Sequence, residues 1–219
     1  MGRSAGQLPN SIQNDQTQLI LASASARRLD LLSQIQIEPG QIVPANIDET
    51  PKKNELPAKY ALRMAFEKVA HVSEEMTCGS ISTFVLAGDT VAAVGRRILP
   101  KAETEQQAWD CLAAISGRRH RVYGGIALRC PDGSVRSRVV QSYVCFRRLS
   151  AVDIDYYIGT RDWQGKAGGY AIQGPAARFI RAIGGSYSNI VGFSLYDVSV
   201  MLASAGFNLK IMQQSSDIV

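Results

Sequence analysis

Small and cationic residues gather between Leu21 and Arg28, where the sequence reads LASASARR. Small side chains let a backbone come close to a ligand, and Ser23, Arg27 and Arg28 add hydrogen-bond donors that suit phosphate oxygens. If a helix begins in this segment, its first N–H groups and its dipole attract an anion as well. Arginines in a first helical turn oppose that dipole, so the pattern favours an anionic ligand over the alternative, a plain helix cap at Ser25. The segment therefore predicts a phosphate-binding loop, although it lacks the GxxxxGK[ST] spacing of a Walker loop.

Carboxylates follow in two places. Asp89 comes at the end of an apolar segment that predicts a buried strand, and open α/β sheets place ligands at the carboxyl ends of strands. An acid there can hold a divalent metal ion or accept a proton from water. A plain turn aspartate is the alternative, and for Asp89 by itself it is the better one. Asp48 and Glu49 are adjacent in a loop, where they either suit a magnesium ion that bridges to phosphates or are simply solvated.

Three lysines, Lys68, Lys101 and Lys166, stand near the ends of predicted elements. Each is ordinary by itself, but together with the two arginines they could neutralise a triphosphate. Gln173 could read a base edge with its amide, although glutamines more often bond to loop backbone. His120 is interpreted as structural, because no nucleophile is near it in the sequence. Neither a GxSxG motif nor a Cys–His pattern is visible, so acyl transfer is unsupported.

These residues need a scaffold, and the composition predicts a globular one. The chain has 219 residues, of which 46% are hydrophobic and 20% charged, which excludes a disordered or fibrous protein. No apolar run approaches the roughly 20 residues that cross a bilayer. We expect a flexible extension at residues 1–16, without the features of a signal or transit peptide, and a single domain with two lobes over residues 17–219.

Hydrophobic periodicity predicts strands and helices that alternate along the chain. Strands are expected at residues 18–22, 41–45, 84–89, 121–129, 135–147, 179–183 and 188–191, with residues 90–94 continuing extended after the third. Helices are expected at about residues 26–38, 57–75, 103–115, 150–160 and 194–205. The turn Pro131–Ser134 joins two of the strands in a hairpin. This order predicts a mixed α/β fold with a parallel start and a hairpin in its second half.

The formal net charge is +5, from 24 Lys and Arg residues against 19 Asp and Glu residues. This charge favours an anionic partner, but the basic residues form short clusters rather than one tail or helix. A nucleic-acid-binding domain is therefore an alternative that no helix-turn-helix, RRM or zinc pattern supports. The cysteines Cys78, Cys111, Cys130 and Cys145 form no CxxC pair, so no structural zinc site is expected and a reducing cytoplasm is the natural compartment.

Taken in order, these segments resemble the Maf family of nucleoside triphosphate pyrophosphatases. The matching segments are LASASARR (21–28), IDE (47–49), RMAFEKVA (63–70), AGDTV (87–91), LPKA (99–102), SGRRHRVYGG (116–125), KAGGYAIQG (166–174) and GGSYSNIVGFSL (184–195). No single motif is decisive, but their joint order and spacing are very specific. The resemblance extends from about residue 18 to residue 206, nearly the whole chain.

The resemblance implies an inosine-triphosphatase-like (Maf/Ham1) fold, in which an elongated mixed β-sheet with flanking helices forms two lobes around a cleft. It also implies hydrolysis of dTTP and UTP to the nucleoside monophosphate and pyrophosphate, with Mg²⁺ or Mn²⁺ as cofactor and a house-cleaning or division-arrest role. By position, Asp89 matches the family's catalytic acid, and Glu49, Lys68 and Lys101 match charged residues that line the cleft. From their charge, Asp89 and Glu49 are the predicted metal ligands. The predicted substrate-binding residues are Ser23, Arg27, Arg28, Lys68, Thr90, Lys101, Lys166 and Gln173, of which Lys166 is predicted from its charge alone.

Some positions depart from the family pattern. Gly88 replaces a common alanine, Phe193 replaces a leucine, and Gly124 stands where threonine is usual, while the charged positions are kept. Two alternatives stay open: a nucleotide-binding regulator of cell division without turnover, and a pyrophosphatase for 7-methyl-GTP or other modified purine triphosphates. The regulator would lack the carboxylates named above, which are all present. A homodimer is left open, and neither a membrane nor a specific nucleic acid is expected as a partner.

Overall fold

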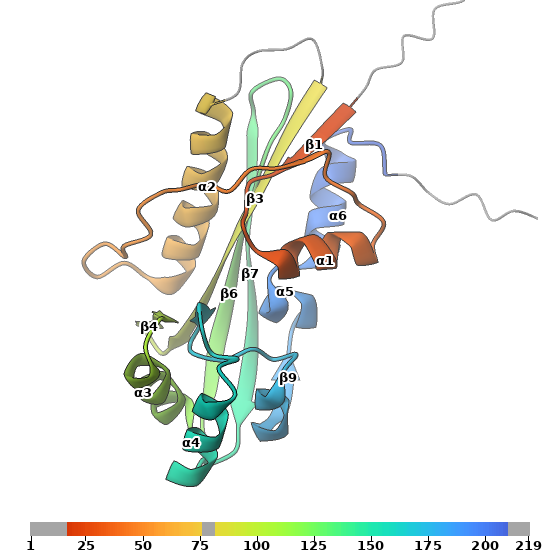
Figure 1. Cartoon of the computed structure of the whole chain (residues 1–219). Coiled ribbons are helices and arrows are strands. Elements are labelled where there is room, and N and C mark those ends of the chain that lie inside the picture. Colours follow the sequence, from red (N-terminus) through yellow and green to blue (C-terminus); the bar gives the residue numbers. More distant parts are fainter. Residues whose placement is uncertain (1–16, 76–81, 210–219) are drawn as a thin grey trace, which may run out of the picture.

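The computed structural model describes residues 17–75 and 82–209 (Figure 1). Its helices are α1 (Ala26–Gln34), α2 (Pro57–Glu75), α3 (Glu105–Ile115), α4 (Ala151–Gly159), α5 (Tyr187–Val191) and α6 (Leu195–Ser204), with a 3₁₀ turn at Pro175–Phe179. Its strands are β1 (Thr17–Leu21), β2 (Gln41–Ile42), β3 (Ser82–Val94), β4 (Arg97–Leu99), β5 (Lys101–Ala102), β6 (Arg119–Arg129), β7 (Val135–Phe146), β8 (Lys166–Ala167) and β9 (Ile180–Gly184).

One mixed sheet forms the frame of the molecule, with the strand order β2-β1-β3-β6-β7-β9 and with β4 paired to β3. The long strands β3, β6 and β7 are antiparallel, whereas β1 pairs in parallel with both β2 and β3. The β6–β7 hairpin closes as its turn residues predict, because Gly133 adopts a φ of +84° and the Asp132 carboxylate accepts a hydrogen bond from the Ser134 N–H at 2.9 Å. The expected elongated mixed sheet with flanking helices is confirmed.

Helices pack on both faces of the sheet (Figure 1). On one face, α2 lies against β3 and β6. On the other face, α5 and α6 contact β6 and β7. The approach of α2 is close because Gly125 in β6 has no side chain: a Cβ there would lie 2.0 Å from the backbone oxygen of Ala61. This close packing brings the buried face of α2, which includes Lys68, against the middle of β3.

The largest apolar cluster extends from Leu19 in β1 to Leu202 in α6 and includes side chains of α3 and α4. These two helices pack against each other at the far end of the sheet from β1. The division into an extension and one domain stays a prediction, and residues 1–16 and Cys78 lie outside the described residues. Within residues 17–75 and 82–209, no helix is long and apolar enough to span a membrane.

One predicted element is wrong, and others change length. Residues 188–191 form most of helix α5 instead of a strand, because the Ser186 hydroxyl caps the helix by accepting from the Asn189 N–H at 3.1 Å. A short apolar run such as Ile190–Val191 does not distinguish a buried strand from a buried helix by its pattern. The strand expected at residues 41–45 shrinks to β2, whereas the helix expected at residues 57–75 is confirmed by α2.

Candidate active site

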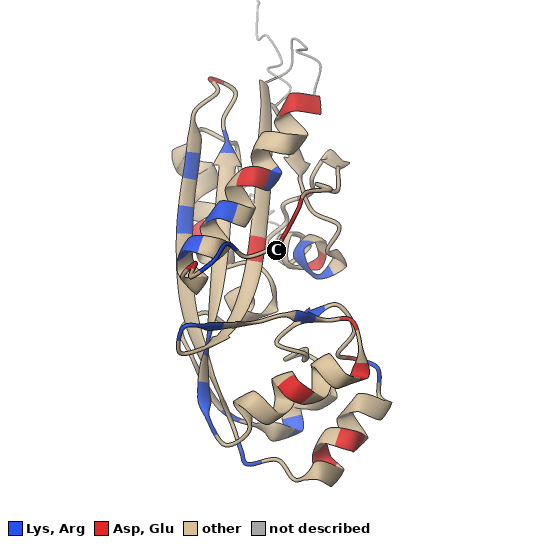
Figure 2. Ribbon diagram, turned by 90° about the vertical axis from the view of Figure 1, so that its left-hand side faces the viewer, with Lys and Arg blue, Asp and Glu red and all other residues tan. Residues whose placement is uncertain are grey.

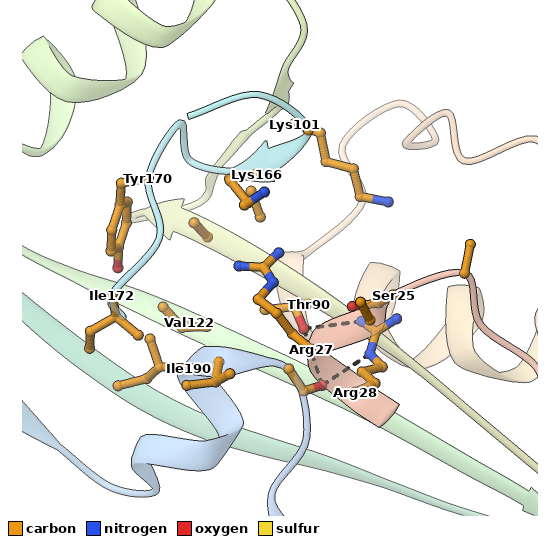
Figure 3. Close-up of a pocket in the computed structure, with 17 residues that line it drawn as sticks. Ser25, Arg27, Arg28, Thr90, Lys101, Val122, Lys166, Tyr170, Ile172 and Ile190 are labelled. Atoms are coloured by element: carbon orange, nitrogen blue, oxygen red, sulfur yellow. Dashed lines mark hydrogen bonds between the residues drawn. The ribbon is translucent and has the colours of Figure 1, made fainter. Parts of the chain in front are cut away.

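Two neighbouring cavities contain most of the predicted site residues. The first, of about 430 Å³, lies between the start of α1, the loop of residues 165–172 and the end of α5 (Figure 3). The second, of about 440 Å³, has Glu49 and Asp89 in its wall. Thr90 and Lys101 line both cavities, so the two are adjoining parts of one cleft.

Asp89 lies in the middle of β3 rather than at its end, which corrects the prediction from sequence. The parallel neighbour β1 ends at Leu21, opposite Leu86, whereas β3 continues to Val94. Asp89 therefore follows the point at which β1 turns away, and on its other side it pairs with Gly125 of β6. With 2% of its surface exposed, its carboxylate is buried in the wall of the second cavity.

A chain of ion pairs connects Asp89 to the loop that carries Glu49. The Lys68 ammonium group lies 2.8 Å from Asp89 Oδ1 and 2.7 Å from Glu49 Oε1, and Lys101 pairs with the other carboxylate oxygen of Glu49. Burial by itself would raise the pKa of Glu49, but hydrogen bonds from Lys101 and Lys68 outweigh burial and lower that pKa to about 2. The cluster therefore holds an ionised Glu49 at neutral pH, beside two cations.

Two residues of α2 that the sequence analysis missed hold this loop in place. The Tyr60 hydroxyl donates to the backbone oxygen of Glu49 at 2.6 Å. The Arg63 guanidinium donates to the backbone oxygen of Thr50 at 3.1 Å and to the Glu55 carboxylate at 2.7 Å. Tyr60 and Arg63 are three residues apart in a helix and so share a face, and Arg63 also begins the segment RMAFEKVA; these two signals could have identified them.

The ion pairs of Glu49 have a measurable consequence for stability in acid. Because the pKa of Glu49 is about 2 in the folded protein against an ordinary 4.5, this group stabilises the fold above about pH 4.5, and the stabilisation is lost as the pH falls toward 2. We expect Glu49→Gln to lower the free energy of unfolding at neutral pH and to approach the wild type as the pH falls through this window. Urea unfolding of both proteins measures the difference, and a difference independent of pH contradicts the assignment.

Arg28, in the first turn of α1, connects this turn to other segments through its guanidinium group. Its Nε donates to the Gly192 carbonyl at 3.1 Å, its Nη1 to Ser23 Oγ at 3.0 Å and its Nη2 to Thr90 Oγ1 at 3.2 Å. The guanidinium carbon lies 5.4 Å from the centre of the Phe193 ring, and 8% of the residue is exposed. Arg28 therefore ties α1 to β3 and to the segment after α5, and it fixes the Thr90 hydroxyl in the cleft.

The departures from the family pattern at Gly88 and Phe193 are in contact. A Cβ on Gly88 would lie 2.3 Å from Phe193 Cε1, so the glycine makes room for the ring that packs on Arg28. We expect Gly88→Ala to destabilise the protein by about 1–3 kcal/mol through overpacking, and Phe193→Leu to restore most of that loss. Thermal unfolding of the two single variants and the double variant measures the coupling. Strictly additive effects would mean that the two positions are independent.

Both arginines line the first cavity, but Arg27 extends into it, whereas the Arg28 guanidinium is bonded to protein groups of its wall (Figure 3). Burial lowers the pKa of Arg27, and Asp162 and Tyr157 raise it in part. Lys166 lines the same cavity, and its pKa is lowered by burial and by the charge of Arg27. Two partly desolvated cations that repel each other in one cavity favour an anion between them. This arrangement supports the predicted phosphate site and gives Arg27 a different role from that of Arg28.

Of three further residues considered from the sequence, one lines the first cavity and two are exposed. Ser25 lines the first cavity at the N-cap of α1 without a cap bond from its side chain, and the Ser23 hydroxyl accepts from the Ser25 N–H at 3.2 Å. Gln173 is exposed and follows Ile172, which lines the cavity, so base reading by Gln173 stays a prediction. Asp48 is turned to solvent and accepts from the Thr50 N–H at 2.9 Å, so the adjacent acids do not act as a pair.

The predicted divalent metal ion has two candidate ligands in the structure, Glu49 and Asp89. Among the described residues, no three His, Cys, Asp or Glu side chains gather as a metal site. Glu49 and Asp89 nevertheless converge on one cation, the Lys68 ammonium group. Mg²⁺ is commonly bound by one or two carboxylates, with water and substrate phosphates as the other ligands. The donor set therefore fits a cation that arrives with a triphosphate.

Comparisons with known proteins agree with this geometry. A family model described as Maf-like protein matches residues 18–205. A dTTP/UTP pyrophosphatase of Paramagnetospirillum magneticum is 55% identical over 189 residues, which cover 86% of this chain and 97% of the relative. A dTTP/UTP pyrophosphatase of Caulobacter vibrioides is 49% identical over 189 residues, which cover 86% of this chain and 96% of the relative.

Among solved structures, a HAM1 protein from Coxiella burnetii is similar with a TM-score of 0.46 and 14% identity, over 86% of this chain and all of that chain. That overlap is too loose to carry an argument about this protein. The sequence matches do carry one, because they extend over most of this chain and nearly all of each relative, with about half of the aligned residues identical. On the strength of the family match over residues 18–205 and of these relatives, the chain belongs to the Maf-like protein family.

Proposed function

We propose that this protein hydrolyses dTTP and UTP to the nucleoside monophosphate and pyrophosphate. The observation that carries the proposal is the joining of two cavities, one lined by cations and one by the ion-paired carboxylates Glu49 and Asp89. The relatives that share about half of its residues are named dTTP/UTP pyrophosphatases. Family membership and the cleft together support a nucleotide pyrophosphatase.

The cations of the cleft suit the triphosphate. The cleft wall carries Arg27, Arg28, Lys101 and Lys166, and the start of α1 adds N–H groups at the positive end of a helix dipole. A triphosphate brings about four negative charges, and phosphoryl transfer depends mostly on positioning and charge stabilisation. The guanidinium and ammonium groups would therefore orient the substrate and stabilise the charge that develops on the leaving pyrophosphate.

We assign Asp89 to the water that attacks the substrate. When a water attacks the α-phosphorus, the bond from that phosphorus to the bridging oxygen breaks, and the water must lose a proton. The Asp89 carboxylate, held in the cleft wall by Lys68, can accept that proton or help to hold a cation. Tyr60 and Arg63 keep the neighbouring Glu49 loop in place.

A divalent metal ion is part of this proposal. Glu49 and Asp89 are the residues that would hold it, together with phosphate oxygens of the substrate. When bound, such an ion would polarise the phosphoryl group and lower the pKa of a bound water. The protein's own share is to supply two carboxylates from different segments and to keep Glu49 ionised.

The alternative functions are less well supported. A regulator without turnover would not need Asp89 and Glu49 beside the cationic cavity. For a nucleic-acid-binding domain, Figure 2 shows Lys and Arg residues on several separate elements rather than along one helix. A reducing cytoplasm stays our proposal for its compartment, in keeping with the buried free thiols of Cys111 and Cys130. A homodimer and the division-arrest role stay predictions.

A substrate panel with product analysis tests the proposal. We expect monophosphate and pyrophosphate from dTTP and UTP with Mg²⁺ or Mn²⁺, and slower turnover of purine triphosphates including 7-methyl-GTP. Binding of dTTP without any turnover would favour the regulator instead. Preference for a purine triphosphate would leave the reaction type intact and overturn the assigned substrate.

A further inference from the structure

One end of the first cavity is apolar, and the mechanism above makes no use of it. Figure 3 places Tyr170, Ile172 and Val122 on one side of Arg27, with Lys101, Ser25 and Arg28 on the other. Ile190 and Val191 of α5 complete the apolar wall. A nucleoside triphosphate is divided in the same way, since its phosphates are anionic at one end and its base has flat apolar faces at the other. The apolar end is therefore the part of the cleft that suits the base.

Tyr170 is the aromatic residue of this wall, and its ring is firmly held. Gly168 and Gly169 precede it with φ values of +70° and +69°, a left-handed conformation that turns the loop onto α3 and β3. The ring packs edge-on against Phe146, with centres 5.0 Å apart, and against His120, with centres 5.4 Å apart. Only 6% of Tyr170 is exposed, and it lines the cavity.

His120 lies behind that ring and has one polar contact among the described residues. Its Nε2 is 2.8 Å from the Tyr170 hydroxyl oxygen, while its Nδ1 is buried without a partner. Only 1% of His120 is exposed, so the uncompensated nitrogen is costly and an apolar side chain would be cheaper to bury. The contact with Tyr170 is thus the feature of His120 that an apolar residue could not supply.

We propose that Tyr170 forms the wall on which the nucleobase packs and that His120 is a positioning residue that fixes the Tyr170 ring through its hydroxyl. This inference rests on the proposed function and names the base subsite within it. Since the hydroxyl lies against His120, Tyr170 offers the base its ring surface. Recognition by packing accepts uracil and thymine alike, because the two bases differ by one methyl group.

Four variants test the two roles. Tyr170→Ala removes the wall, Tyr170→Phe removes only the hydroxyl, and His120→Phe leaves that hydroxyl buried and unpaired. The double variant His120→Phe/Tyr170→Phe removes both partners of the hydrogen bond, a change that is often nearly neutral. Phe84→Ala is the matched control, because Phe84 is a buried aromatic residue of β3 that lines neither cavity.

Two probes separate the base from the phosphates: dTTP as substrate, and inorganic tripolyphosphate as a competitive inhibitor without a base. For Tyr170→Ala we expect KM for dTTP to rise about 10-fold or more, because a base–aromatic contact is lost, with little change in the tripolyphosphate inhibition constant. For His120→Phe we expect a smaller rise in KM, which the double variant reverses to near the wild-type value. Phe84→Ala should lower the melting temperature without moving either constant.

The outcomes that overturn the proposal are distinct. An unchanged KM for Tyr170→Ala removes the base wall, and a parallel rise in the tripolyphosphate constant shows general distortion of the cleft instead. A double variant no better than His120→Phe removes the positioning role. If the wild type does not turn over dTTP, the proposed function fails, and the melting-temperature shifts given by a non-hydrolysable dTTP analogue and by tripolyphosphate still decide the base subsite.

Discussion

Replacement of Asp89 by asparagine is expected to lower kcat by about 10²–10⁴-fold, the usual cost of losing a general base. Asparagine keeps the size of the side chain and an oxygen toward Lys68, but it cannot accept a proton from water and is a poor ligand for a divalent cation. The fold should be retained, because Glu49 still pairs with Lys68 and the chain around Asp89 is fixed by the pairing of β3 with β6.

Steady-state kinetics with dTTP or UTP measure this effect, with a melting curve to confirm folding. Asp132→Asn is the control, because it makes the same chemical change in the exposed β6–β7 turn, which lines neither cavity. The control should retain wild-type kinetics. If Asp89→Asn keeps more than about a tenth of the wild-type kcat, Asp89 is not part of the mechanism.

The second large effect is expected at Arg27. If its guanidinium binds phosphate, each charge-assisted contact contributes about 1.5–3 kcal/mol, so Arg27→Ala should lower kcat/KM by about 10–100-fold. The free protein should be as stable as the wild type or slightly more stable, because the substitution removes a positive charge from the first turn of α1 and from beside Lys166. The effects on binding and on stability thus have opposite signs.

Melting curves with and without a non-hydrolysable dTTP analogue separate the two effects. Arg27→Ala should show a normal melting temperature alone and a reduced shift with the analogue. Arg28→Ala is the contrasting variant: it should melt at a lower temperature without ligand, because it removes three hydrogen bonds, to the Gly192 carbonyl and to the Ser23 and Thr90 hydroxyls. An unchanged ligand shift in Arg27→Ala would show that Arg27 does not contact phosphate.

Much of the fold follows from local pattern. The helix over residues 57–75 was predictable because its apolar residues recur at helical spacing after a proline that suits a first turn. The β6–β7 hairpin was predictable because two long runs flank a Pro-Asp-Gly-Ser turn. The error at residues 188–191 arose where the helix is a single short turn whose start depends on the Ser186 cap.

The site was predictable as a set of residues but not as an arrangement. Arg27 and Arg28 are equivalent in the sequence, yet the Arg28 guanidinium is bonded to protein groups of the cavity wall, whereas Arg27 extends into the cavity. Asp48 and Glu49 are also equivalent, yet only Glu49 meets Lys68. Such differences depend on which side of a chain faces a distant element, and neighbouring residues in a sequence do not record that.

The contacts that hold the site in place were the least predictable. The contacts of Tyr60 with Glu49, of Arg63 with Thr50 and of Tyr170 with His120 join residues 11 to 50 positions apart, so local spacing does not reveal them. The hydrogen bond from Arg28 to the Gly192 carbonyl joins residues 164 positions apart. Spacing within a helix gives a hint for Tyr60 and Arg63, whereas the role of Tyr170 depends on the packing of its ring against His120 and Phe146.

Hydrolysis of dTTP in water enriched in ¹⁸O tests the central claim most directly, because it reports which phosphorus the water attacks. The account predicts dTMP that carries the label and unlabelled pyrophosphate, since Asp89 and the cations of the cleft are assigned to attack at the α-phosphorus with pyrophosphate as the leaving group. Mass spectrometry of the products distinguishes the cases. Labelled orthophosphate with dTDP, or label in the pyrophosphate, would contradict the account.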